Sequence, residues 1–242
     1  MRYWRAYGFA FDHPKWAKNW LLGSVCVLIP VVGPIVHMGW MFEVIEGFVR
    51  RGESTWEIFE FDKFGRYLTR GVWPFLVSLI LGLVVMPIVA VVMALWIVFI
   101  ISSKGNPDPV LLWLFIVGLM LFSLLLNVIL SLVKTPMLLR AGLTQDLGAA
   151  FSKAYTLDFL RKMWLELLLA GLFLAFTSLP LVLLGEACCF IGVFPAIALV
   201  VMAEHHLYYQ LYTLYLQRGG MAIPLKPEPA TVTPTPEENE PV

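Results

Sequence analysis

The stretch "IPVVGPIVHMG", from Ile29 to Gly39, decides how the chain passes through its first apolar region. It places two prolines, Pro30 and Pro34, on either side of Gly33. A proline inside a helix removes a backbone hydrogen bond and clashes with the preceding turn. The stretch therefore either kinks one long helix or turns the chain round between two helices.

The apolar residues of this sequence come in blocks, which indicates an α-helical integral membrane protein. Hydrophobic residues make up 60% of the 242 residues and charged residues only 14%, whereas soluble domains are about one quarter charged. The segments 71–103, 110–133 and 167–185 contain no charged residue. Blocks of this length reach or exceed the ~18 apolar residues typical of a membrane helix. In lipid each backbone polar group must be hydrogen-bonded internally, which favours helices.

Lysine and arginine cluster in three segments: the N-terminal segment, residues 50–70 and residues 134–162. Positively charged segments stay on the cytoplasmic side of a membrane, so we expect all three there. The chain must then reverse between residues 1 and 50, which favours a turn at Pro30, Gly33 and Pro34. Each arm has about 17 residues, or ~25 Å of helix, against a ~30 Å membrane core. A re-entrant hairpin therefore stays open as the alternative to two full crossings.

The predicted fold class is all-α, an integral membrane bundle of six hydrophobic helices without β-sheet. The helices are expected at residues 14–30, 34–50, 72–102, 109–139, 160–184 and 193–217. With the interfacial loops 51–71 and 140–159 they form a single membrane domain, residues 1–218. Residues 219–242 are rich in proline and glutamate, which is typical of a disordered tail. We expect a multi-pass protein of the cell (inner, cytoplasmic) membrane with both termini in the cytoplasm.

Five ionisable residues in the second and sixth predicted helices form a candidate polar pocket: His37, Glu43, Glu204, His205 and His206. Ionisable groups at membrane depth are costly unless they are paired. They form either a pocket that handles protons or a small solute, or a set of interhelical hydrogen bonds that holds the bundle together. Adjacent histidines point to different faces of a helix, so no metal site is predicted. No catalytic motif was found, and no cofactor is expected.

The helix at residues 160–184 carries small residues on one face. Gly171, Ala175 and Ser178 follow the spacing i, i+4, i+7, which lets another helix approach closely. The expected partners are the lipid bilayer and either another membrane protein or a second copy of the chain, with no nucleic acid. Four tyrosines late in the last helix are typical of an interfacial aromatic belt: Tyr208, Tyr209, Tyr212 and Tyr215.

A series of landmarks in this chain resembles a prokaryotic membrane family known as domain of unknown function 4013. In order, they are "FDHPKW", "IPVVGPI", "RRGE", "FEFDKFG", "QDLGAAF" and "CCFIGVFPA". The resemblance extends over residues 8–218. It implies a multi-pass membrane protein and supplies no catalytic residues.

Three hypotheses about function follow from these patterns. The first is a non-catalytic scaffold or accessory subunit of the membrane, because no catalytic constellation is recognisable. The alternative is a transporter or handling protein for a small solute or lipid, which would use the intramembrane glutamate and histidine residues. An intramembrane enzyme is the third.

Overall fold

The computed structural model describes residues 1–53, 56–103, 106–188 and 190–226. In chain order the elements are α1 (Arg5–Asp12), α2 (Trp16–Leu28), α3 (Val32–Arg51), the short 3₁₀ helix η1 (Phe61–Lys63), α4 (Phe64–Ser102), α5 (Pro109–Thr144), α6 (Leu147–Ala150), α7 (Lys153–Ala187) and α8 (Val193–Gln217). These described ranges contain no β-strand, which confirms the all-α prediction.

The quoted stretch is a turn between two helices and not a kink in one. α2 ends at Leu28 and α3 begins at Val32, with Val31 at a positive φ of 64° between them. Pro34 falls in the first turn of α3, where a helix has no internal partner for the missing N–H. A side chain at Gly33 would overlap the carbonyl group of Cys26, so glycine allows the two helices to meet closely here.

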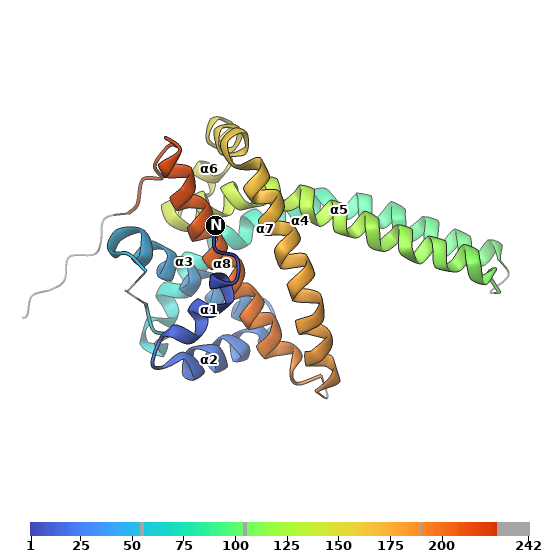
Figure 1. The fold of residues 1–242 in the computed structure, drawn as a ribbon, viewed down its shortest axis with the longest axis horizontal. Helices are drawn as coiled ribbons and strands as arrows, with labels where there is room; N and C mark the ends of the chain where they lie inside the picture. Colours follow the sequence, from blue (N-terminus) through green and yellow to red (C-terminus); the bar gives the residue numbers. More distant parts are fainter. Residues whose placement is uncertain (54–55, 104–105, 189, 227–242) are drawn as a thin grey trace, which may run out of the picture.

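A packed body contains α1, α2, α3, α6, α8 and the adjoining halves of α4, α5 and α7 (Figure 1). α3 lies within it, and large side chains such as Trp40 and Phe42 are fully enclosed. α4 crosses α3 at Gly39 and Gly71, where a β-carbon on either glycine would overlap a backbone carbonyl of the other helix. This backbone-to-backbone contact fixes the start of α4 against the first half of α3.

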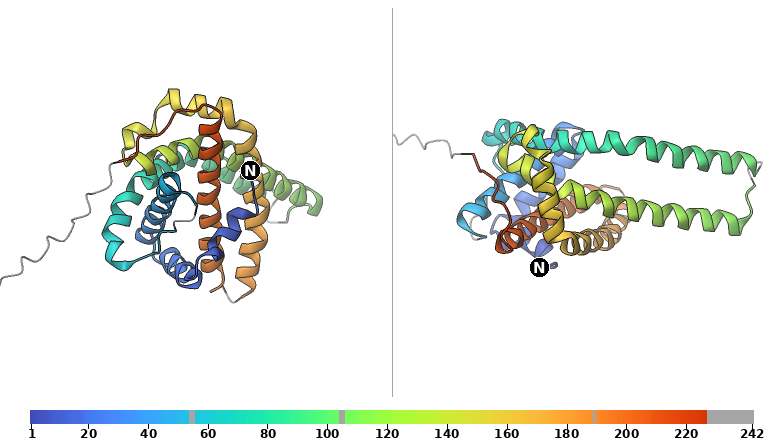
Figure 2. Two further views of the ribbon diagram at one scale, coloured as in Figure 1. Left: turned by 60° about the vertical axis from the view of Figure 1, so that its left-hand side comes forward. Right: turned by 90° about the horizontal axis from the view of Figure 1, so that it is seen from above.

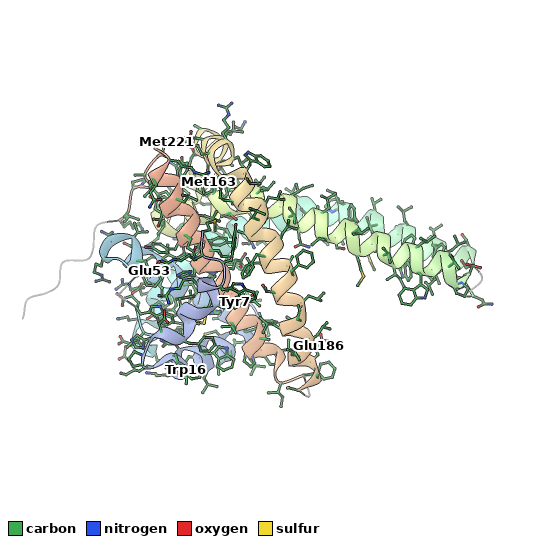
Figure 3. All side chains as sticks on the ribbon, in the orientation of Figure 1. Tyr7, Trp16, Glu53, Met163, Glu186 and Met221 are labelled. Atoms are coloured by element: carbon green, nitrogen blue, oxygen red, sulfur yellow. The ribbon has the colours of Figure 1, made fainter. Side chains whose placement is uncertain are left out.

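The remaining halves of α4 and α5 leave the body together as a long hairpin (Figures 1 and 2). In the most apolar 18-residue window of α4 no residue is buried, and in that of α5 only 6% are. Apolar side chains project from both helices on several sides (Figure 3). The apolar half of α7 instead runs beside α8 toward Glu186 (Figure 3) and contacts α1, with the Tyr7 hydroxyl 2.8 Å from Thr177 Oγ1. α4 and α5 therefore show two halves, one packed against protein and one uncovered, whereas the apolar half of α7 is partly covered.

The prediction of six membrane helices is corrected: three helices, and not six, have the length and composition to span a membrane. In the described part of the chain, the helical segments Phe61–Ser102, Pro109–Thr144 and Lys153–Ala187 are long and apolar enough to cross a membrane. α2 has 13 residues, or ~20 Å, which is short of a ~30 Å core. α3 is interrupted by buried ionisable residues, and α8 loses its apolar character at Glu204, halfway along its length.

Several boundaries differ from those predicted. α1 precedes the first predicted helix, and only the last helix has the predicted bounds. The predicted loops 51–71 and 140–159 are largely helical, because α4 begins at Phe64, α5 continues to Thr144 and α7 begins at Lys153. Each of these extensions lies in the body, where tertiary packing stabilises turns that hydrophobicity alone does not mark.

The first part of the predicted disordered tail packs against α8. Ile223 is 4% exposed, and its N–H donates to the Tyr212 hydroxyl at 2.8 Å. The N–H of Met221 donates to the Tyr215 hydroxyl at 3.0 Å. Both tyrosines are buried, so they hold the segment that follows α8 and do not form an exposed aromatic belt. Residues 227–242 of the predicted tail lie outside the described residues.

Candidate functional site

A charged cavity of about 390 Å³ lies where the second half of α3 meets the start of α4. Arg66 and Arg70 are four residues apart and share one face of α4. The close crossing at Gly39 and Gly71 turns that face toward the glutamates of α3. The local sequence therefore brings two short runs of opposite charge together.

Ion pairs link the two helices at this cavity. Arg66 Nη2 lies 2.9 Å from Glu43 Oε1, and Arg70 Nη2 lies 2.5 Å from Glu46 Oε2. Glu46 Oε1 also accepts from Arg50, 2.6 Å from its Nη2. Burial raises the pKa of the Glu43 carboxyl, and the positive charge of Arg66 opposes this rise. Glu43 thus belongs to an ionic wall between α3 and α4.

Glu204 lies elsewhere, facing α5. Its Oε1 accepts from the Tyr208 hydroxyl at 2.5 Å and lies 3.8 Å from Lys134 Nζ. A cavity of about 30 Å³ adjoins these groups, between α5, α7 and α8. That volume suffices for about one or two water molecules. Glu204 therefore pairs with a lysine that emerges from the apolar region of α5.

His37 and His205 lie between α2, α3 and α8, and both are at most 2% exposed. His205 Nδ1 is 2.7 Å from the Val201 carbonyl oxygen, and the His37 ring stacks on Trp40. Neither Nε2 atom has a hydrogen-bond partner among the described residues. Burial, and then the charge of His205, lowers the pKa of His37 to about 3. His37 is therefore a neutral ring in a helix interface.

His206 points into a different cavity, of about 370 Å³, between α1, α3 and α8. Its ring stacks on Phe9 with the ring centroids 4.4 Å apart, and its Nδ1 lies 3.0 Å from Gln210 Nε2. Burial, and then the positive charges of Arg5 and Arg2, lowers the pKa of His206 to about 4.

The five residues of the predicted pocket therefore do not share one cavity. His205 lies close enough to both His37 and Glu204 for their charges to interact, while Glu43 and His206 lie elsewhere with partners of their own. The sequence reasoning missed the partners Arg66, Arg70 and Lys134. The i, i+4 spacing of the two arginines, just before the apolar block, was the available signal.

The small-residue face of α7 is divided between two surroundings. A β-carbon on Gly171 would lie 2.9 Å from Ser131 Oγ, so this end packs on α5. Ala175 instead lines an open apolar groove of about 550 Å³, walled by Trp96, Ile116, Leu119, Met120, Ser123, Leu124, Phe176 and Leu179. Ser178 lies one turn further, its hydroxyl 3.4 Å from the Ala175 carbonyl oxygen. The outer part of the face is thus open to another apolar group.

In the ranges that the structure describes, no three histidine, cysteine, aspartate or glutamate side chains form a group that could hold a metal ion. No curated protein and no solved structure matches this chain. A family model described as "Protein of unknown function (DUF4013)" matches residues 22–202. That range includes α3, the α4–α5 hairpin, α7 and the first part of α8. The chain therefore belongs to the DUF4013 family, as the landmark motifs indicated.

Proposed function

We propose that this chain is an integral membrane protein that acts as a non-catalytic assembly subunit. In this proposal the α4–α5 hairpin and the apolar half of α7 enter the bilayer. The body remains at the membrane surface, and the apolar groove between the hairpin and α7 accepts a hydrophobic helix of a partner membrane protein. The observation that carries the proposal is the uncovered apolar surface of these three helices.

This apolar surface is too large to face water in the native protein. Between residues 79 and 125, 21 large hydrophobic residues are exposed. Removing such a side chain from water is worth about 1.5 kcal/mol or more, so covering all of them is worth tens of kcal/mol. Domains are stable by only ~5–15 kcal/mol. Lipid or another protein must therefore cover the hairpin.

The distribution of charge supports a cytoplasmic body. The three positively charged segments all contribute to the body, and Arg5 Nη2 lies 3.6 Å from Glu53 Oε2, so the N-terminus and the "RRGE" corner share one side. Under the positive-inside rule this side faces the cytoplasm. Single cysteines at Glu53 and at Pro107, near the hairpin tip, would then be labelled by an impermeant thiol reagent from opposite sides of the membrane. Labelling of both from one side would contradict this orientation.

The groove supports assembly because its floor contains a small residue. At Ala175 no bulky side chain fills the space between α5 and α7, and apolar side chains form the walls. Transmembrane helices associate where small residues let them approach closely. The alternative, solute handling by Glu43, Glu204 and the histidines, receives less support because these residues do not share one cavity.

Native electrophoresis of membranes solubilised in mild detergent tests the assembly role. The full chain should migrate as a complex with at least one further membrane protein. Ala175→Trp fills the groove and should reduce the amount of complex at least tenfold. Leu184→Trp places the same side chain on an exposed part of α7 outside the groove and should leave the complex intact. A lone monomer for the wild-type chain, or equal complexes for both variants, would contradict the proposal.

A further inference from the structure

The charged cavity between α3 and α4 has the size and lining of a small-molecule site. Its volume of about 390 Å³ lies within the range of ligand pockets, ~300–1,000 Å³. Side chains reach it from α3, from Glu57 in the segment after α3, from α4, from Gln145 at the end of α5 and from Lys226. Five separate parts of the chain thus converge on one space.

The lining carries an excess of positive charge. Five cationic side chains (Arg50, Arg51, Arg66, Arg70 and Lys226) face three carboxylates (Glu43, Glu46 and Glu57), which leaves an excess of two positive charges. Each carboxylate already pairs with arginine. Lys226 Nζ instead lies 3.4 Å from the neutral Gln145 Oε1. The chain as a whole has no net charge, so this excess is a local feature.

Two buried groups in this wall have unused hydrogen-bonding capacity. Arg70 is only 3% exposed, and its Nε has no hydrogen-bond partner in the described parts of the chain. A guanidinium has five donors in a planar fork, which matches the oxygens of a phosphate. Glu43, 4% exposed, likewise leaves Oε2 without a partner. A phosphate ester that also bears a hydroxyl group has the acceptor and the donor that these two groups lack.

The position of the cavity matches the level of lipid headgroups. Arg70 is the last charged residue before the apolar run 71–103 of α4. If α4 enters the bilayer, as in the proposed function, this side of the cavity lies where apolar chain gives way to headgroups. Phosphate esters with free hydroxyls, such as glycerophosphate, occur there.

We propose that this cavity binds a phosphate ester bearing a hydroxyl group, supplied by the headgroup of an acidic phospholipid. Arg66, Arg70 and Lys226 hold the phosphate, and Glu43 accepts from the hydroxyl. The inference goes beyond the assembly role, since the cavity lies in the body and not in the apolar groove.

Binding to the delipidated full chain in detergent tests the proposal. Native mass spectrometry would compare phosphatidylglycerol with phosphatidylcholine, and calorimetry would use sn-glycerol 3-phosphate and inorganic phosphate. Arg66→Gln and Lys226→Gln each remove one charge at an exposed position and should weaken binding about tenfold. Lys153→Gln removes an equal charge from an exposed site that does not line the cavity and should have no effect. Helix content and melting temperature would establish that each variant is folded.

Preference for phosphatidylglycerol, lost in the two cavity variants only, supports the lipid headgroup as the source. Binding of glycerol phosphate or inorganic phosphate with the same variant pattern, but without lipid preference, supports the phosphate site and assigns it to a soluble ligand. Equal binding by all four proteins, or no binding of any probe, overturns the proposal. The soluble probes and the calorimetric readout do not depend on the groove, so this result is independent of the assembly experiment.

Discussion

The body and the α4–α5 hairpin are both helical and rich in apolar residues, but they differ in what surrounds those residues. In α3, 13 of 20 residues are buried against other helices, including His37 and Glu43. In the apolar window of α4 none is buried. Charged side chains occur where protein supplies them with partners, and the runs 71–103 and 110–133, for which lipid would be the neighbour, contain none. The comparison shows that one helix can belong to both regions, since α4 begins in the body and ends in the hairpin.

The largest difference between the two regions is expected when the same substitution is made in both parts of α4. Gly71→Val should abolish the body, at a cost above about 4 kcal/mol, because its β-carbon would overlap the Ile35 carbonyl. Gly82→Val, in the hairpin, meets no atom within 4 Å and should change stability by less than about 1 kcal/mol. Thermal unfolding followed by circular dichroism measures both. Similar melting temperatures for the two variants would mean that the α3–α4 crossing is not as close as described.

A second comparison asks which region lies in lipid. Val91→Asp in the hairpin should cost about 2.5–3.5 kcal/mol of insertion free energy if α4 spans the bilayer, and should reduce the carbonate-resistant fraction in membranes. Val25→Asp makes the same change at an exposed position of α2 in the body. It should have little effect, because α2 is too short to span. An equal loss for Val25→Asp would indicate that α2 also lies in the membrane interior. No loss for either variant would indicate that the hairpin does not lie there.

A third prediction concerns the pH dependence of stability that His206 gives to the body. Burial and the nearby charges of Arg5 and Arg2 lower its pKa to about 4, with Asp12, His13 and Glu53 lining the same cavity. The unfolded chain binds a proton near pH 6.5 and the folded chain does not. Stability is therefore complete above pH 6.5 and falls as the pH decreases toward 4.

At pH 5 the loss of folding stability caused by His206 should be about 2 kcal/mol. His206→Gln should lose that part of the pH dependence, whatever its stability at pH 7.5. The measurement is the difference in melting temperature between pH 7.5 and pH 5 for each protein in the same detergent. An identical difference for the wild-type chain and the variant would show that His206 is not protected from protonation.

Much of the fold followed from the sequence because charge-free blocks are strong signals. The blocks at 71–103, 110–133 and 167–185 became the three long apolar helices, and the prolines around Gly33 became a turn. The number of membrane helices was overestimated because α3 and α8 are apolar in order to pack against protein. Apolar residues for a protein core and for lipid look alike in a sequence.

The candidate site was less predictable, since it depends on which helix faces meet. The sequence identified Glu43 and Glu204 as ionisable groups that are costly to bury. Their pairing, Glu43 with Arg66 and Glu204 with Lys134, follows from the crossing of α4 over α3 and of α8 over α5. Two glycines thirty-two residues apart set the first of these crossings. Nothing in the local pattern of either glycine indicates its partner.

The smallest expected effect concerns the edge of the body, where the chain after α8 is held. Tyr212→Phe removes the hydroxyl that accepts the N–H of buried Ile223, at a cost of about 1 kcal/mol. Hydrogen exchange of the Ile223 amide should then accelerate about fivefold, whereas amides of α7 near Phe159 should keep their protection and serve as the internal control. Unchanged exchange at Ile223 would mean that hydrophobic burial alone retains this segment. Faster exchange throughout α7 would instead mean that Tyr212 supports the whole body. Only a local effect fits a segment after α8 that is attached to a core already complete without it.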